Sequence, residues 1–392
     1  MKMKHVLVAF MVLGLAFTMP APAFSQAKSD TIKIGAFLPM TGGVAAYGQG
    51  SWQGIQAARE MKPTILGKKV ELFLADDKSD KIEAANAVSR LVEKEKVIAI
   101  IGSSISGNTM AGAPIAEKAG IPIISPTATN PLVTQGKKYI FRVCFIDPFQ
   151  GEMAAKYAYE TLGKRKAALI IDKAQDYCVG LADFFEKSFT KLGGQIVAKT
   201  YCQTGDKDFT AQLSAIKAKN PDVLYMPNYY TEVALAMKQA KDLGLNLPVL
   251  SGDGAQDKAL IDIGKQYVEG LMLTGHFEKE AASTPLAKKF IPLYEKKYGK
   301  VGTFDVMGAD AYFVLADAIE RAKSTDGAKI RAALATTKNF KGISGTMTIG
   351  EDGNAIKSLV IVQVRGGDFR YVATVEPAGA KPEPKKAAPK KK

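Results

Sequence analysis

Residues 97–109 read Val-Ile-Ala-Ile-Ile-Gly-Ser-Ser-Ile-Ser-Gly-Asn-Thr, an apolar run that ends at Gly102 and passes into hydroxyl-bearing residues. A run of β-branched residues without polar alternation predicts a strand that is buried on both faces of its sheet. The polar segment that follows predicts a turn into a helix. A doubly covered strand joined directly to a helix is typical of the parallel sheets of α/β proteins.

The same pattern repeats outward from this segment. We predict a first series of strands and helices, and a second series that starts near residue 150. The first comprises strands 31–38, 70–75, 97–101, 121–125 and 139–145, with helices 47–61, 81–94 and 109–119. The second comprises strands 167–171, 195–201, 223–226, 248–250 and 270–274, with helices 180–192, 209–219 and 232–243. Helices 285–298 and 305–322 and an antiparallel group of strands, 345–349, 358–365 and 369–375, follow. The fold class predicted is therefore α/β, with two doubly wound parallel-sheet lobes.

The two ends differ in composition from the rest. Residues 1–25 have a basic start, an apolar run over 6–17 and small residues before Gln26, which is typical of a secretory signal peptide cleaved near Ser25. The apolar run is too short to cross a bilayer comfortably. Residues 377–392 are rich in Lys, Pro and Ala without apolar periodicity, and we predict a disordered basic tail there.

The net charge of +14 is concentrated at these ends. Eight of the 53 Lys and Arg residues lie in the leader and in the last twelve residues, so the remaining body is only mildly basic. We therefore predict no nucleic-acid partner.

The composition also argues against most catalytic and metal chemistry. The chain has two histidines, His5 and His276, and His5 lies in the predicted leader. No phosphate loop, nucleophile elbow or Cys-x-x-Cys motif occurs, and the glycines from Gly48 to Gly54 have the wrong spacing for a dinucleotide fingerprint, so we interpret them as packing glycines. His276 is interpreted as structural. We predict no enzyme activity, no cofactor and no metal site.

Three cysteines, Cys144, Cys178 and Cys202, allow at most one disulfide within the chain. Export would permit such a bond, and Cys178 with Cys202 is the pair we favour, because both belong to the second series of elements. The alternative is that all three are buried thiols.

Polar residues gather where predicted strands pass into helices. Ligands of open α/β sheets bind at the carboxyl ends of strands. Free N–H groups at helix starts and Ser or Thr hydroxyls suit a carboxylate, an acid such as Asp253 suits an ammonium group, and aromatic rings suit an apolar body. Together these features favour a site for a zwitterion. The segments concerned are 102–109, 125–131, 172–177 and 251–254.

Here the chain resembles a known family, the periplasmic solute-binding proteins of ABC importers, in the branched-chain amino-acid-binding branch. The resemblance covers nearly all of residues 30–375. It rests on the order and spacing of segments 32–43, 46–48, 76–77, 100–104, 124–131, 141–142 and 206–209. It implies a type I periplasmic-binding fold, in which two lobes are joined by three crossover strands and close around the ligand by hinge motion.

The resemblance also implies domain limits. Lobe one is expected at about 30–146 plus 278–352, and lobe two at about 147–277 plus 353–376. The disulfide that the family carries in its first lobe has no counterpart, because no cysteine precedes Cys144.

Site residues carried over by the resemblance are as follows. The ligand carboxylate is expected at Ser106 and at the stretch Thr127, Ala128 and Thr129, with Thr129 and the backbone of Thr127 also near the ammonium. Asp253 is the expected counter-charge, where the family's amino-acid binders usually have Glu. The expected side-chain pocket consists of Tyr47, Tyr177, Tyr229 and Phe304, although Tyr230 could replace its neighbour.

The implied function is a periplasmic, monomeric binding component that delivers a small amino acid of the branched-chain type to an ABC permease of the inner membrane. The alternatives within this fold are an aromatic carboxylate, an amide or urea as ligand, or a role as soluble partner of a sensor. An envelope enzyme is a further alternative, and turnover of a ligand would reveal it.

Overall fold

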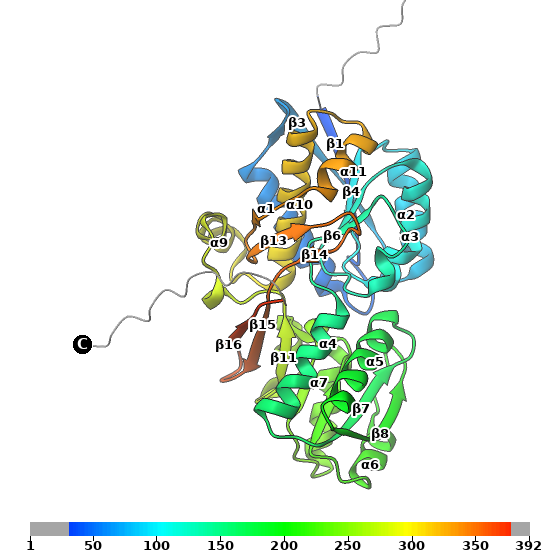
Figure 1. Ribbon diagram of the computed structural model, residues 1–392, viewed down its shortest axis with the longest axis vertical. Helices are drawn as coiled ribbons and strands as arrows, with labels where there is room; N and C mark the ends of the chain where they lie inside the picture. The colour runs from blue at the N-terminus through cyan, green and yellow to red at the C-terminus, as the bar shows by residue number, and fades with distance from the viewer. Residues whose placement is uncertain (1–30, 378–392) are drawn as a thin grey trace, which may run out of the picture. The chain divides into compact units, whose positions relative to one another are not determined.

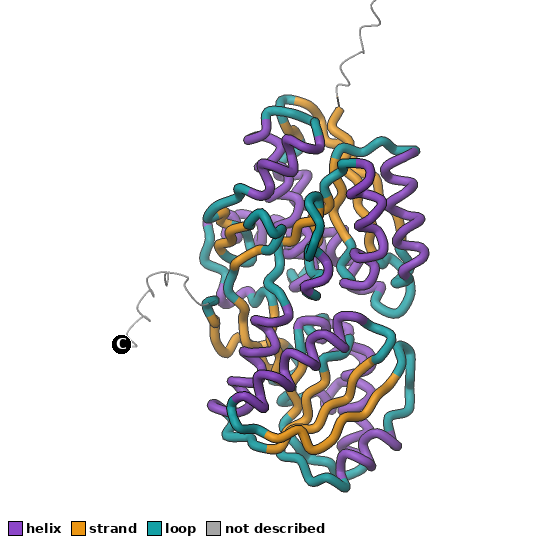
Figure 2. Tube along the Cα trace, turned by 45° about the vertical axis from the view of Figure 1, so that its right-hand side comes forward, coloured by secondary structure: helices purple, strands orange, loops and turns teal. Residues whose placement is uncertain are grey.

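The computed structural model describes residues 31–377, and the predicted leader and all but the first residue of the predicted tail lie outside that range. Within it, strands and helices alternate along the chain, and the strands gather in two large sheets and one small one (Figures 1 and 2). This confirms the predicted α/β class with two lobes.

The first sheet has the order β2-β3-β1-β4-β5-β6. Its strands are β1 (Thr31–Leu38), β2 (Thr64–Ile65), β3 (Lys68–Asp76), β4 (Ala99–Gly102), β5 (Ile123–Ser125) and β6 (Ile140–Arg142). All pairings are parallel except that of β2 with β3. The run that begins at Val97 therefore lies in the middle of the sheet, as its apolar sequence predicts.

Helices cover both faces of this sheet. One face packs α2 (Lys81–Glu93) and α3 (Ser106–Ala119) against Phe37 and Ile100. The other packs α1 (Ala45–Met61), α9 (Pro285–Tyr298), α10 (Thr303–Ala322) and α11 (Gly327–Ala335) against Ile34 and Ile101. Neighbouring strand residues thus serve opposite cores.

Gly54, in the group of glycines that begins at Gly48, is a packing glycine between two helices. Helix α1 lies beside α10 (Figure 1), and a Cβ at Gly54 would come 1.8 Å from the backbone oxygen of Asp305. Only glycine permits this approach, so the packing interpretation is confirmed.

The second sheet has the order β16-β15-β11-β10-β9-β7-β8. Its strands are β7 (Lys166–Asp172), β8 (Gln195–Cys202), β9 (Val223–Met226), β10 (Val249–Ser251), β11 (Met272–Gly275), β15 (Leu359–Val364) and β16 (Phe369–Val375). The last two are antiparallel, as predicted. The helices of this lobe are α4 (Asp147–Lys156), α5 (Asp176–Lys191), α6 (Thr210–Lys217), α7 (Tyr230–Asp242) and α8 (Lys258–Gly264).

Short elements complete the described chain. The small sheet consists of β12 (Phe340–Lys341), β13 (Thr346–Ile349) and β14 (Ala355–Ile356), and its buried residues join the core around α10. Single helical turns are η1 (Pro131–Val133), η2 (Tyr157–Thr161), η3 (Asp253–Ala255), η4 (Lys265–Val268) and η5 (Lys279–Ala281).

The chain passes between the large sheets three times: between β6 and α4, after β11, and between β14 and β15. The first passage follows Arg142, and the second follows Gly275. The third is later than residue 352, because β14 still pairs with β13. The exact lobe limits stay a prediction.

Candidate functional site

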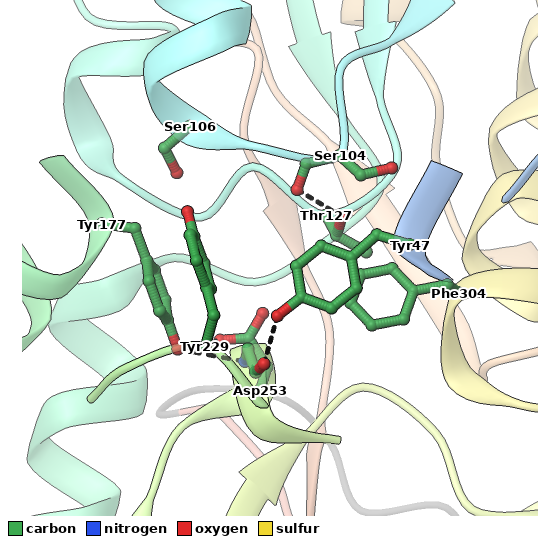
Figure 3. A pocket seen from close by; sticks show the side chains of 9 residues that line it. Tyr47, Ser104, Ser106, Thr127, Tyr177, Tyr229, Asp253 and Phe304 are labelled. Carbon is green, nitrogen blue, oxygen red and sulfur yellow. Dashed lines mark hydrogen bonds between the residues drawn. The ribbon is translucent and has the colours of Figure 1, made fainter. Parts of the chain in front are cut away.

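A pocket lies between residues of the two lobes, and nine residues line it (Figure 3). Seven of them are predicted site residues: Tyr47, Ser106, Thr127, Tyr177, Tyr229, Asp253 and Phe304. The other two, Ser104 and Gly254, belong to strand-end segments that the sequence already marked. The free space is about 10 Å³, room for roughly one water molecule. An amino acid can therefore enter only if the walls move apart.

The first wall is the junction of β4 with α3. Helix α3 begins at Ser106, and the residue before it, Ile105, provides no side-chain cap. The first N–H groups of a helix have no partner within the helix, and the helix dipole adds positive potential at this end. The Thr127 hydroxyl donates to the Ser104 carbonyl (2.9 Å) and ties the neighbouring loop to this wall. This arrangement suits a carboxylate.

Gly102 makes this junction possible. Its φ of +132° lies in the region that favours glycine, and a Cβ there would come 2.0 Å from the Phe37 carbonyl oxygen. The glycine that ends the apolar run is therefore required by the turn that presents Ser104 and Ser106.

Two predicted residues are placed beside the pocket and do not line it. Ala128 and Thr129 are fully buried. The Ala128 N–H donates to Ser125 Oγ (3.0 Å), and its carbonyl accepts from Arg142 Nη1 (2.6 Å). The Thr129 carbonyl accepts from the Asp147 N–H (3.1 Å). These backbone groups hold the loop in place, and ligand contact by either residue stays a prediction.

Aromatic rings form the middle of the pocket (Figure 3). Tyr47 stacks on Phe304, with ring centroids 4.0 Å apart, and Tyr177 is parallel to Tyr229 at 5.6 Å. Tyr47 meets Tyr229 edge to face. Tyr230 also contacts the Tyr47 ring at 5.3 Å, but only Tyr229 lines the pocket, so the choice between these neighbours favours Tyr229.

The second wall is built around Asp253, whose side chain faces the serines across the rings (Figure 3). Its Oδ1 accepts from Tyr177 Oη (2.9 Å) and from Gln150 Nε2 (2.7 Å), and its Oδ2 lies 2.9 Å from His276 Nε2. Burial, and next the charge of Asp253, raise the pKa of Tyr177 well above its ordinary value. Tyr177 is therefore a neutral donor at physiological pH.

The sequence reasoning missed Gln150 and assigned His276 only a structural role. His276 follows the end of β11, which is the same kind of position that marked the other segments. Its place directly after a predicted strand could therefore have marked His276 as a candidate site residue. Gln150 lies within α4, and no local pattern marks it.

Several bonds cross from one lobe to the other. The Tyr47 hydroxyl, on α1, donates to the Gly254 carbonyl. At the edge of the site, Lys81 Nζ lies 2.7 Å from Asp176 Oδ2, and Asn130 Nδ2 donates to the Asp176 carbonyl (2.9 Å). These contacts close the pocket, and opening it requires breaking them.

The three cysteines are free and buried, so the Cys178–Cys202 pairing is wrong. Each thiol packs in an apolar core, and burial raises the pKa of Cys144 and Cys202 to about 12. Such thiols stay protonated and unreactive. Over residues 31–377 there is neither a group of side chains suited to hold a metal ion nor a helix long and apolar enough to span a membrane.

Comparison with known proteins agrees with this architecture. A sequence model of the family described as "Periplasmic binding protein" matches residues 31–368. The "Leu/Ile/Val-binding protein homolog 3" of Brucella melitensis is 32% identical over 84% of this chain and 90% of its own. The "Leucine-, isoleucine-, valine-, threonine-, and alanine-binding protein" of Pseudomonas aeruginosa is 29% identical over 90% and 93%.

Solved structures show the same likeness. A leucine-binding protein, LivK, from Thermotoga maritima superimposes with a TM-score of 0.87 at 50% identity, covering 88% of this chain and 99% of that one. LivJ from Streptococcus pneumoniae, solved in complex with isoleucine, gives 0.84 at 33% identity, covering 88% and 100%. This chain therefore belongs to the family of periplasmic binding proteins, in the branch of the branched-chain amino-acid-binding proteins with the type I fold.

Proposed function

We propose that this protein binds a small α-amino acid, of the branched-chain type, between its two lobes and delivers it unchanged to an ABC permease. One observation carries the proposal. The uncapped start of α3 with Ser104, Ser106 and Thr127 forms one wall, and the carboxylate of Asp253 forms the opposite wall. Groups complementary to both ends of a zwitterion thus face each other across aromatic rings.

The closed walls explain how binding couples to motion. Ligand that touches both lobes stabilises the closed arrangement, because those contacts do not exist when the lobes are apart. The closed protein then presents surfaces of both lobes to the permease. The LivJ structure with isoleucine, which shares this fold, supports the choice of ligand class.

The remaining parts of the proposal concern export and assembly. The protein is exported to the periplasm, its leader is removed near Ser25, and it acts as a monomer without enzyme activity. Amino-terminal sequencing of the periplasmic protein should begin at Gln26, and light scattering should give the mass of one chain.

The test is a binding screen by calorimetry against leucine, isoleucine and valine, each with its analogue that lacks the amino group. A ligand at a hundred times its dissociation constant adds about 2.7 kcal/mol to stability, so a thermal-shift assay can precede calorimetry. Refolding before the screen removes any ligand that copurifies.

Asp253→Asn keeps the shape of the side chain and removes its charge. We expect amino-acid affinity to fall about 30- to 4,000-fold, because truncating one side of a buried charge pair costs about 2–5 kcal/mol. Asp172→Asn is the matched control: Asp172 is a buried carboxylate at the end of β7 that binds the Ala174 N–H and the Thr204 hydroxyl and does not line the pocket. Equal affinity of the wild type and of Asp253→Asn for leucine would contradict the proposal.

The rings of the pocket favour one second candidate, an aromatic carboxylate. A solute-binding protein from Rhodopseudomonas palustris with this fold (TM-score 0.80, 25% identity, 88% of this chain and 98% of that one) was solved with 3,4-dihydroxybenzoic acid. Tight binding of benzoates that is insensitive to Asp253→Asn would favour this candidate.

A further inference from the structure

The buried carboxylate of Asp253 has four lone-pair positions, and the protein uses three of them. Gln150 and Tyr177 both donate to Oδ1, which fills that oxygen. Oδ2 has one protein partner, Nε2 of His276. One lone pair of Oδ2 is therefore left for a ligand, and its direction depends on how His276 holds that oxygen.

The setting of His276 fixes its tautomer. The ring is fully buried, and it packs against Phe145 with centroids 4.1 Å apart. Nδ1 has no hydrogen-bond partner. An Nε2–H tautomer donates to Asp253 and leaves only an acceptor nitrogen unpaired. An imidazolium would bury an Nδ1–H without an acceptor, which is costly.

Neutrality of this ring matters for the ligand. A neutral donor orients Asp253 but leaves its full negative charge available to an ammonium group. A cationic partner in the same place would cancel that charge. Burial is the main cause that lowers the pKa of His276 below its ordinary value, against the opposing charge of Asp253.

From this geometry we propose that His276 is a positioning residue for the ligand's amino group: its Nε2–H holds Oδ2 of Asp253 so that the remaining lone pair faces the pocket. The inference deepens the proposed function and rests on it. It assigns to His276 a part in selecting ligands that carry a primary ammonium group.

Other charged groups surround the pair. Lys357, from the segment before β15, lowers the pKa of His276 further, and the charge of Asp253 also acts on Asp147, on α4. Burial, and next the charge of Asp253, raise the pKa of Asp147 well above its ordinary value. A protonated His276 would be a cation beside Asp253 and would compete with the ligand's ammonium group for that carboxylate.

The first experiment reads the ring directly. The chain has two histidines, so the His5→Gln chain labelled with ¹⁵N-histidine gives one imidazole signal. We expect the neutral Nε2–H tautomer at pH 7 and a titration midpoint below 6.5. Saturation with L-leucine should lower this midpoint further. If a protonated His276 weakens leucine binding, bound leucine must equally disfavour protonation of His276, because the coupling between the two is reciprocal. An Nδ1–H tautomer, an imidazolium at pH 7, or a midpoint that leucine does not move would overturn the inference.

The second experiment compares two variants by calorimetry with L-leucine. His276→Gln keeps an N–H donor near the position of Nε2 and should retain most of the affinity. His276→Phe keeps a flat ring beside Phe145 but has no donor, and we expect affinity to fall ten- to a hundredfold, as for the loss of a hydrogen bond to a charged group. Wild-type affinity in His276→Phe, or equal losses in both variants, would refute the positioning role.

The two hypotheses fail in different ways. If the wild type binds none of leucine, isoleucine and valine, the proposed function fails before any variant is compared. If it binds leucine and the His276 variants bind equally well, only the inference fails.

Discussion

The hydrogen bond from the Tyr47 hydroxyl to the Gly254 carbonyl joins α1 of one lobe to the Asp253 turn of the other. Both groups are buried, and the Tyr47 ring is held independently by its stack on Phe304. Tyr47→Phe therefore removes one bond between the lobes and leaves the ring in place. Burial is the main cause that raises the pKa of Tyr47 well above its ordinary value, so the bond is made by a neutral phenol.

The size of the effect of Tyr47→Phe on lobe closure follows from the Gly254 carbonyl, which loses its hydrogen-bond donor. An unsatisfied buried acceptor costs about 1–3 kcal/mol, but only in the closed arrangement, since water can solvate the Gly254 carbonyl when the lobes are apart. This shifts the closing equilibrium by about 5- to 150-fold. Apparent affinity falls by the same factor when the closed form is a minor state of the free protein. Calorimetry with leucine measures the loss, and small-angle X-ray scattering measures the closed fraction.

Tyr312→Phe is the matched control. The Tyr312 hydroxyl donates to the Lys62 carbonyl (2.7 Å), and both residues belong to the same lobe. Its loss should lower thermal stability without changing the affinity. The reasoning is refuted if Tyr47→Phe leaves both the affinity and the closed fraction unchanged, or if Tyr312→Phe weakens binding equally.

Three further changes test other parts of the structure. Lys81→Met removes the exposed ion pair with Asp176 and should change the affinity less than about fivefold, with the effect shrinking as salt rises in calorimetry, because exposed pairs contribute about 0–1 kcal/mol. Gly54→Ala should destabilise the protein strongly in thermal unfolding, since its Cβ meets the Asp305 carbonyl, and a wild-type melting temperature would contradict the packing described. Burial is the main cause that raises the pKa of Asp77 to about 6, so the folded state binds more protons than the unfolded state between about pH 4 and 6, and stability from this group falls as pH rises through that window. Asp77→Asn should remove that fall. Measured by urea unfolding, the free energy of unfolding of the variant relative to the wild type should therefore be about 2–3 kcal/mol higher at pH 7 than at pH 4. The same difference between variant and wild type at both pH values would refute the raised pKa of Asp77.

The class of fold and the segments that line the pocket could be predicted from the amino-acid sequence. Short β-branched apolar runs such as the one from Val97 favour strands covered on both faces, and the glycine and hydroxyl residues behind them mark strand ends. Because parallel strands end at the same edge of a sheet, Ser106 and Thr127 could be placed together without a structure. The resemblance to a family then supplied Tyr47 and Phe304, which line the pocket, and a predicted role for Asp253. The helices α4, α8 and α11 were not predicted, and each is short or broken in its apolar pattern.

Tertiary structure alone decided which side chains hold one another in the site. His276 and Gln150 meet Asp253 across 23 and 103 residues, and Tyr47 meets Gly254 across 207. The packing of the second lobe likewise keeps Cys178 and Cys202 apart, as two buried free thiols. Local sequence sets the conformation of each segment through side-chain sterics and periodic burial. It does not set which lone pair a distant donor fills, because that depends on how whole lobes pack.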